Sequence, residues 1–149
     1  MPFEGDRKPV PFLKTAFRTD QGQFSPNGRW LAYSSTESGK REVFVQGFNL
    51  DPSRPRGKWQ VSTDGGTDPR WRHDGKELYY YGAKGLMAVE VKTDGTSFEA
   101  GIPKPLFDVR VLSSGRNHFL VTRDGQRFLV VTPLEETSNA PLQVLVNWR

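Results

Sequence analysis

Three segments of this chain share one pattern and recur at intervals of about 50 residues. Each has a large apolar residue three positions before an Asn-Gly or Asp-Gly pair, and a polar residue and an apolar stretch follow the glycine. The segments are Phe24–Tyr33, Trp71–Tyr80 and Val121–Val130. Such a period is typical of folds in which similar supersecondary units stack and bury a face against their neighbours. The repeat therefore predicts an array of similar units.

The Asn-Gly or Asp-Gly pair predicts a tight turn in every unit. In Ser25–Gly28, the proline presets φ at the second turn position, asparagine tolerates the third, and glycine supplies the left-handed conformation that closes a hairpin. Gly75 and Gly125 stand at the same place in the other units. Each unit should therefore contain a central hairpin, with the apolar residue before each turn in an equivalent place.

Short strand signals dominate the rest of the chain. Runs of β-branched and aromatic residues are bounded by Gly, Pro, Asp or Ser, and no long stretch shows the 3.6-residue apolar recurrence of an amphipathic helix. The runs are Arg29–Ser34, Glu42–Gln46, Lys58–Ser62, Glu77–Tyr81, Leu86–Val91, Gln126–Val131 and Leu142–Val146. The sequence therefore predicts an all-β fold.

Each hairpin has room for two further strands, which makes four strands in about 50 residues, as in a β-propeller blade. We expect the additional first strands at Val10–Leu13, Lys58–Val61 and Pro105–Val109. The expected arrangement is one segment of three four-stranded blades over residues 1–149, with blades at about 1–50, 51–99 and 100–149. The connectors Asn49–Gly57 and Thr96–Gly101, rich in Pro, Gly and polar residues, separate the blades.

The composition restricts the classes of function. The chain has no cysteine, which excludes disulfides and thiolate chemistry, and no apolar run approaches the roughly 18 residues that a membrane span needs. The first residues lack the apolar core of a signal peptide, so the chain is either cytosolic or cut from a longer precursor. A net charge of +4 indicates a solvated surface, and nucleic-acid binding is not expected from the basic residues. The closest basic cluster is Arg54, Arg56, Lys58, Arg70 and Arg72.

At these repeated residues the chain resembles the TolB-like, WD-repeat-like β-propellers. Phe24–Tyr33 follows the blade signature of an aromatic residue, Ser-Pro-Asp-Gly and a short apolar strand, with Asn27 in place of aspartate. Further runs resemble the C-terminal propeller of bacterial eukaryotic-like serine/threonine kinases and related sensor proteins. They are Gly57–Gly66, Pro69–Leu78, Leu86–Val91, Gly125–Val130 and Leu145–Trp148. The resemblance implies a sensor or interaction module outside the cytoplasm, and any kinase activity would belong to a missing N-terminal region.

Three blades are too few to close a ring, so apolar faces and strand edges would stay exposed at both ends. The resemblance implies six or more blades, so the chain should be half of a propeller. Either further blades lie upstream in a longer protein, or two copies associate about a two-fold axis into a homodimer with six blades. A protein partner is the other expected form of association, and membrane insertion is not expected.

Candidates for catalysis or metal binding are few. His73 and His118 are the only histidines, and a zinc site would need both together with a carboxylate, so no metal or other cofactor is expected. Ser25 lies in an ordinary turn and not in the strained Gly-x-Ser-x-Gly turn of a nucleophile. Asp74 and Asp124 are repeat-equivalent and are expected to form turns. No catalytic residue is therefore predicted.

A binding surface can be predicted from the topology. The turn of each hairpin and the link to the next blade should emerge on one face and form a basic and polar rim. This rim would contain Asn27, Arg29, Arg54, Arg56, Arg72, His73, Asp74, Arg123 and Asp124. The leading interpretation is a non-enzymatic recognition or scaffold module for protein–protein interaction or ligand sensing, as the C-terminal part of a larger bacterial signalling protein. The alternative is half of a propeller enzyme, a hydrolase or lyase, whose central-channel site forms when the ring is completed.

Overall fold

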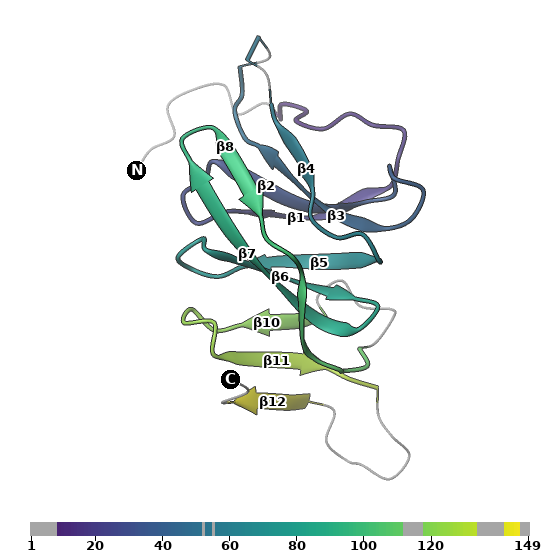
Figure 1. Cartoon of the computed structure of the whole chain (residues 1–149). Helices are drawn as coiled ribbons and strands as arrows, with labels where there is room; N and C mark the ends of the chain where they lie inside the picture. The colour runs from purple at the N-terminus through teal and green to yellow at the C-terminus, as the bar shows by residue number, and fades with distance from the viewer. Residues whose placement is uncertain (1–8, 52, 55, 112–117, 134–141, 147–149) are drawn as a thin grey trace.

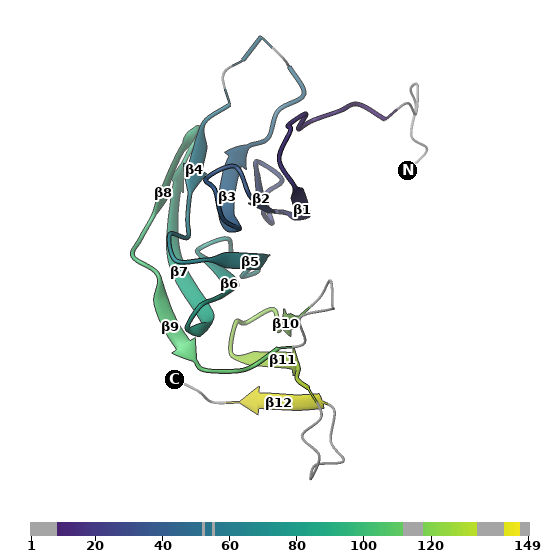
Figure 2. The same cartoon turned by 90° about the vertical axis from the view of Figure 1, so that its right-hand side faces the viewer.

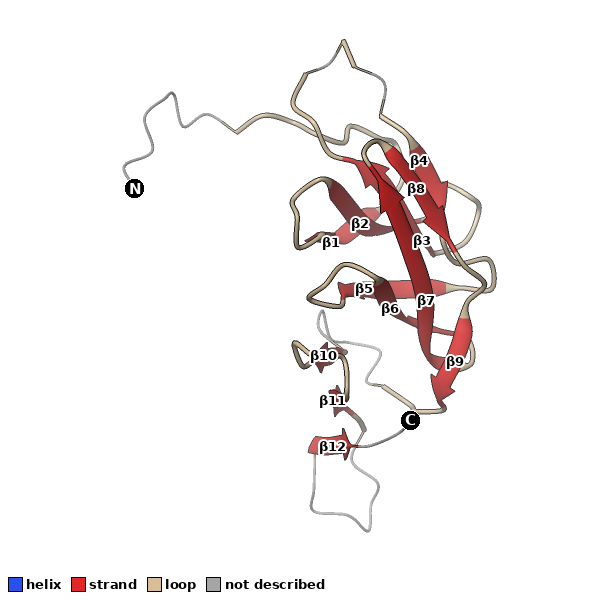
Figure 3. Cartoon of the chain, turned by 60° about the vertical axis from the view of Figure 1, so that its left-hand side comes forward, coloured by secondary structure: helices blue, strands red, loops and turns tan. Residues whose placement is uncertain are grey.

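The structure is a computed structural model that describes residues 9–51, 53–54, 56–111, 118–133 and 142–146. Strands make up all of its regular secondary structure, and these residues contain no helix (Figure 3). The predicted all-β class is therefore confirmed. All strand pairs are antiparallel, and they form three separate sheets that follow one another along the chain.

The first sheet is a four-stranded meander. Its strands are β1 (Thr19–Phe24), β2 (Trp30–Ser35), β3 (Glu42–Gly47) and β4 (Lys58–Gln60), in that spatial order. The third sheet is likewise a meander, of β10 (Phe119–Val121), β11 (Arg127–Val131) and β12 (Leu142–Val146). Neighbouring strands in each meander are consecutive in sequence, so each sheet forms largely from local contacts.

The second sheet has five strands, and its outer edge is divided between two of them. Its strands are β5 (Gly66–Trp71), β6 (Glu77–Gly82), β7 (Gly85–Asp94), β8 (Ser97–Ala100) and β9 (Lys104–Phe107). The long strand β7 pairs through Val91–Asp94 with β8 and through Leu86–Ala88 with β9. The chain therefore turns back on β7 twice before it leaves the sheet.

The three sheets are arranged one after another, as Figures 1 and 2 show. In Figure 2 the first strands β1, β5 and β10 lie on one side of this array, whereas β4, β8 and β9 lie on the opposite side. Among the described residues no strand of the first sheet pairs with a strand of the third, so the array remains open. The first strands of all three sheets thus line one common side.

The first and second sheets each include a strand that the sequence analysis assigned to the next unit. Lys58–Gln60 pairs with β3 and completes the first sheet, and Lys104–Phe107 pairs with β7 in the second. The segment Val10–Leu13, expected to be the first strand of the first unit, lies outside any strand. These assignments were wrong because short apolar runs reveal a strand but not which neighbour it will pair with.

The repeated turns are equivalent in detail, and the prediction of a central hairpin in each unit is confirmed. Gly28, Gly75 and Gly125 have φ angles of 69°, 72° and 72°, in the left-handed region that glycine tolerates. In each turn the side chain before the glycine accepts a hydrogen bond from the backbone N–H two residues further on, at 3.0 Å. These acceptors are the Oδ1 atoms of Asn27, Asp74 and Asp124.

Two of these glycines allow a matched stability test. A Cβ at Gly125 would approach Tyr79 Oη to 2.6 Å and Arg72 Cδ to 2.7 Å, whereas a Cβ at Gly28 would meet nothing within 4 Å. Both alanine variants carry the cost of a left-handed residue, about 1–2 kcal/mol. We expect Gly125→Ala to lower the free energy of unfolding by about 1–3 kcal/mol more than Gly28→Ala, because the clash is added. Urea denaturation of both variants measures the difference, and equal losses would contradict the packing at Gly125.

Apolar side chains fill the two spaces between the sheets. The core between the first and second sheets contains Trp30, Ala32, Val43, Val45, Val61, Leu78, Tyr80, Met87, Val89, Val91 and Phe98. The core between the second and third sheets contains Tyr79, Leu86, Ala88, Val111, Phe119, Phe128 and Val130. The middle sheet therefore buries both faces, and this agrees with the nearly continuous apolar character of β6 and β7.

The two outer faces of the array differ. On the first sheet, Tyr33 and Phe44 stack with ring centroids 6.0 Å apart and are almost fully buried. On the third sheet, Leu120 pairs in register with Leu129 on the face opposite Phe128, and Leu120 is 53% exposed. An apolar hollow of about 360 Å³ lies at this face. The third sheet therefore ends in an apolar surface that the described residues leave largely open.

Candidate functional site

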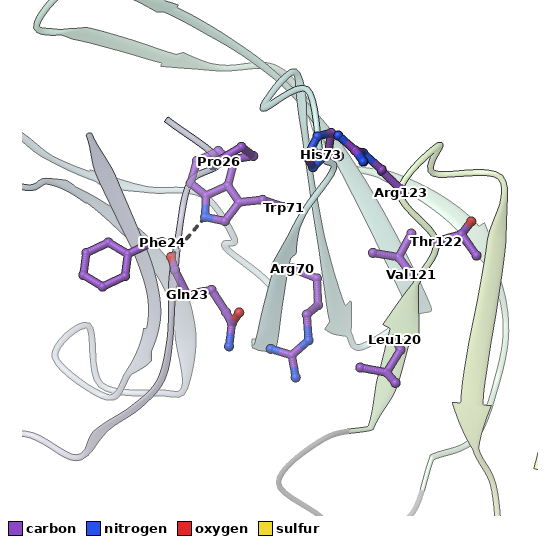
Figure 4. A pocket seen from close by; sticks show the side chains of 10 residues that line it. All are labelled: Gln23, Phe24, Pro26, Arg70, Trp71, His73, Leu120, Val121, Thr122 and Arg123. Atoms are coloured by element: carbon purple, nitrogen blue, oxygen red, sulfur yellow. Dashed lines mark hydrogen bonds between the residues drawn. The ribbon is translucent and has the colours of Figure 1, made fainter. Parts of the chain in front are cut away.

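A pocket of about 550 Å³ lies where the first strands of the three sheets come together (Figure 4). Residues of β1, β5 and β10 and of the turns that follow them form its walls. The lining residues are Gln23, Phe24, Pro26, Arg70, Trp71, His73, Leu120, Val121, Thr122 and Arg123. Because all three sheets contribute, the pocket depends on how the sheets are placed relative to one another.

One wall of the pocket comes from the repeat itself. Phe24, Trp71 and Val121 are the apolar residues that precede the three equivalent turns, and all three line the pocket. Trp71 is fixed by a hydrogen bond of 3.1 Å from its Nε1 to the carbonyl oxygen of Gln23 (Figure 4). Phe24 is 55% exposed and packs edge-on against Phe48, with ring centroids 4.7 Å apart. The pocket therefore has aromatic surfaces as well as polar groups.

The charged groups of the pocket are the guanidinium groups of Arg70 and Arg123. His73 also lines it, and among the described lining residues there is no carboxylate. In Figure 4, His73 and Arg123 are drawn at the turns, whereas the side chain of Arg70 extends away from the turns along the strands. The amide of Gln23 and the hydroxyl of Thr122 add hydrogen-bonding groups. This chemistry suits an anionic ligand.

Arg70 is almost fully buried, and neighbouring residues hold its side chain. Only 9% of the residue is exposed, and its Nη1 donates a hydrogen bond of 3.1 Å to the carbonyl oxygen of Pro69. Its Nη2 lies 2.8 Å from Oδ1 of Asp68, which is fully buried. The ion pair is close, although its N–H is not aligned as a hydrogen bond to this oxygen. A guanidinium held in this way has fewer conformations to lose when a ligand binds.

The predicted rim residues separate into groups. His73 and Arg123 both line the pocket, whereas Arg72 and Asp74 form an ion pair of 2.7 Å within one turn. The hydrogen bond from Arg72 holds the pKa of Asp74 at about 2, with further help from the backbone N–H of Lys76. Arg72 also lies 2.7 Å from Glu77. These two rim residues neutralise each other.

Other predicted rim residues serve the turns. Asn27 accepts hydrogen bonds from the Ser25 hydroxyl and from the backbone N–H of Arg29. Asp124 accepts hydrogen bonds from the Thr122 hydroxyl and from the Gln126 backbone N–H. Both lower its pKa, and the bond from Thr122 has the larger effect. The predicted turn-forming role of Asp74 and Asp124 agrees with these contacts.

The basic residues of the long connector lie apart from the pocket. Arg54 makes an ion pair of 3.3 Å with Asp51. Arg56 lies over the ring of Phe12, 4.5 Å from its centroid, and donates a hydrogen bond to the carbonyl oxygen of that residue. Neither arginine lines the pocket, so the structure does not gather the predicted rim residues into one site.

Sequence reasoning did not select Arg70, Gln23 or Thr122 as site residues. The available signal was the repeat: Gln23, Arg70 and Leu120 are equivalent residues directly before the aligned apolar positions. Equivalent positions on the first strands converge because these strands lie side by side at the common edge. An alignment of the units therefore points to the pocket, although it does not say which chemistry the pocket holds.

In the part of the chain that the structure describes, no group of three or more His, Asp or Glu side chains could hold a metal ion. Within the same residues, no helix is long and apolar enough to cross a membrane. His118, considered above as a zinc ligand, lies 3.5 Å by its Nδ1 from Oδ2 of Asp68.

The fold is similar to that of a solved structure. No protein-family model matches the sequence, and no curated protein matches it either. The crystal structure of a protein from Bacteroides uniformis, provisionally assigned as a 6-phosphogluconolactonase, aligns with a TM-score of 0.52 and 21% sequence identity. The alignment covers 74% of this chain and 32% of the other. The chain thus matches about a third of that protein's length.

This comparison corrects the expected family. The matched structure is that of a protein assigned as a lactonase and not a TolB-like propeller of a kinase-linked sensor, so the TolB-like assignment is wrong. The expected non-enzymatic signalling role rested on that assignment and is wrong with it. The Ser-Pro-Asn-Gly and Asp-Gly motifs report hairpin geometry, which unrelated antiparallel repeats also need. The motifs therefore did not specify the family.

Proposed function

We propose that this chain is part of an enzyme that hydrolyses the lactone of a phosphorylated sugar acid, at a site that includes the pocket between β1, β5 and β10. This is the hydrolase form of the alternative interpretation. The observation that carries the proposal is the pocket itself, with Arg70, His73 and Arg123 beside aromatic walls. The likeness to the Bacteroides uniformis protein supports an enzyme fold, and its name supplies the substrate class to test.

The pocket chemistry fits such a substrate. Guanidinium groups bind phosphate oxygens through charge-assisted and often bidentate hydrogen bonds. The flat side chain of Trp71 can contact the apolar face of a sugar ring, and the amide of Gln23 can bind a sugar hydroxyl. We assign phosphate binding to the arginines and ring binding to the aromatic wall.

The reaction is the addition of water to a lactone carbonyl. The water loses a proton to a base as its oxygen bonds to the carbonyl carbon, which gives a tetrahedral oxyanion. The ring C–O bond then breaks and the ring oxygen takes up a proton, so the products are an acid group, ionised at neutral pH, and a hydroxyl group on one open chain. A cationic donor beside the oxyanion stabilises this intermediate. His73 is the lining side chain that can accept a proton from the attacking water when its imidazole is neutral.

We further propose that the three sheets are successive blades of a β-propeller segment and that the open third sheet meets another sheet. A second copy of the chain or a longer parent chain would supply it. The supporting observation is the apolar face with Leu120 and Leu129. Light scattering coupled to size exclusion checks self-association. A dimer mass supports a second copy, and a folded monomer would count against it.

Direct assay of lactone hydrolysis tests the proposed activity. The substrate is 6-phosphogluconolactone, prepared immediately before use because it hydrolyses spontaneously, and formation of the open acid is followed by phosphorus NMR. We expect the protein to raise the rate above the buffer rate and to prefer this substrate to gluconolactone without phosphate. A rate equal to that of buffer, at protein concentrations where the fold is intact, would rule out the proposal for this chain.

A further inference from the structure

Beside the pocket, three polar residues occupy one repeated position in the three sheets. Gln21, Asp68 and His118 each stand three residues before the apolar residue that precedes a turn. Gln21 and Asp68 lie at irregularities in the pairing of β1 and β5, and both have a φ angle of 56°. A residue other than glycine is strained in the left-handed conformation, which persists only where the surroundings of the residue hold it. The contacts that hold Gln21 and Asp68 run between the sheets.

The three residues are linked from sheet to sheet by one kind of contact. Oε1 of Gln21 accepts a hydrogen bond of 2.9 Å from the backbone N–H of Asp68. Oδ2 of Asp68 accepts a hydrogen bond of 2.6 Å from the backbone N–H of His118. The side chains of Gln21 and Asp68 thus each bind the backbone of the equivalent residue in the next sheet. These contacts set the spacing of the first strands, and therefore of the pocket walls.

Asp68 has a second role that Gln21 does not have. Its Oδ1 faces the Arg70 guanidinium at 2.8 Å, while its Oδ2 holds the residue directly before β10. One buried carboxylate therefore contacts both the pocket cation and the strand that carries Leu120 and Val121 in the opposite wall.

We infer that Asp68 is a positioning residue of the proposed anion pocket, where it fixes the Arg70 guanidinium and the start of the β10 wall in one geometry. The inference rests on the proposed function only in that the pocket binds a phosphate group. A purely electrostatic role of Asp68 would have the opposite effect on anion affinity. If Asp68 were only a counter-ion, it would weaken the attraction of Arg70 for an anion, and its removal would strengthen binding.

Asp68→Asn separates these two roles. Asparagine is nearly the same size and tolerates the left-handed backbone, so the strand irregularity should persist. Its amide has one acceptor oxygen and one donor nitrogen. The amide oxygen can therefore accept a hydrogen bond from either the His118 N–H or the Arg70 guanidinium. The other of these two donors then faces the N–H groups of the amide. Either orientation disturbs the pocket, although the net positive charge near Arg70 has increased.

The probe is inorganic phosphate, with its affinity measured by isothermal titration calorimetry at constant ionic strength. We expect Asp68→Asn to bind phosphate about 10-fold more weakly than the wild-type chain, a change of about 1.4 kcal/mol. The matched control is Asp74→Asn, which removes an equal charge from an exposed turn outside the pocket and should change the affinity less than twofold. Unchanged or tighter binding by Asp68→Asn would overturn the inference.

A second variant covers the case in which Asp68→Asn does not fold. Arg70→Lys keeps the charge but loses the planar fork that Asp68 orients. We expect about a 10-fold loss of phosphate affinity, and wild-type affinity in this variant would overturn the inference. Phosphate binding is also independent of turnover. A wild-type chain that binds phosphate but leaves the lactone intact would refute the proposed activity alone, whereas no phosphate binding at all would refute both.

Discussion

Replacing Phe128 with alanine is expected to remove a large part of the stability of the chain. Phe128 is fully buried between the second and third sheets. Its ring centroid lies 5.1 Å from that of Tyr79, 5.7 Å from that of Phe107 and 6.4 Å from that of Phe119. Phenylalanine-to-alanine changes in a core cost about 3–5 kcal/mol, and a domain has only about 5–15 kcal/mol in total. We expect a loss in that range.

Chemical denaturation followed by tryptophan fluorescence measures this loss. The matched control is Leu129→Ala, the next residue on the same strand, which points to the open face of the third sheet and should cost less than about 1 kcal/mol in the monomer. A cost at Leu129 that rises with protein concentration would instead indicate that self-association covers this face. Equal losses at Phe128 and Leu129 in dilute protein would contradict the described arrangement of the second and third sheets.

The sequence was sufficient to predict the hairpins, because their signals are local. The Asn-Gly and Asp-Gly pairs require a left-handed glycine and a side-chain acceptor, and Gly28, Gly75 and Gly125 have these features. The β-branched and aromatic runs likewise became strands. Which sheet received Lys58–Gln60 or Lys104–Phe107 was not predictable, because that choice depends on distant pairing partners and not on the run itself.

The site was harder to predict because its most important strand has poor strand composition. β5 reads Gly-Thr-Asp-Pro-Arg-Trp, and an Asp-Pro pair normally indicates a turn. The structure accepts Pro69 because β5 is the edge strand of its sheet, where a missing N–H is tolerated. The structure tolerates the left-handed conformation of Asp68 because its backbone N–H donates hydrogen bonds to the side chains of Gln21 and Ser34. Contacts between sheets therefore create the site, and one sequence does not reveal them.

The largest functional effect is expected at Arg70. Arg70→Gln removes the positive charge but keeps an N–H donor for Asp68, which avoids leaving that buried carboxylate without a partner. Because a charge-assisted bidentate contact to phosphate is lost, we expect phosphate affinity to fall about 100-fold or more, roughly 2.8 kcal/mol. Lactone turnover at low substrate concentration should fall about as much, because Arg70 is assigned to binding the phosphate group of the substrate.

The control for Arg70→Gln is Arg29→Gln, which makes the same charge change at an exposed turn residue that does not line the pocket. Screening at physiological salt limits the reach of an exposed charge to about 8 Å, so Arg29→Gln should keep phosphate affinity within about twofold of wild type. If both variants lost affinity equally, the attraction would come from overall charge and not from the pocket. If neither lost affinity, the pocket would not bind anions. Only a large loss confined to Arg70 supports a site built by the three converging strands.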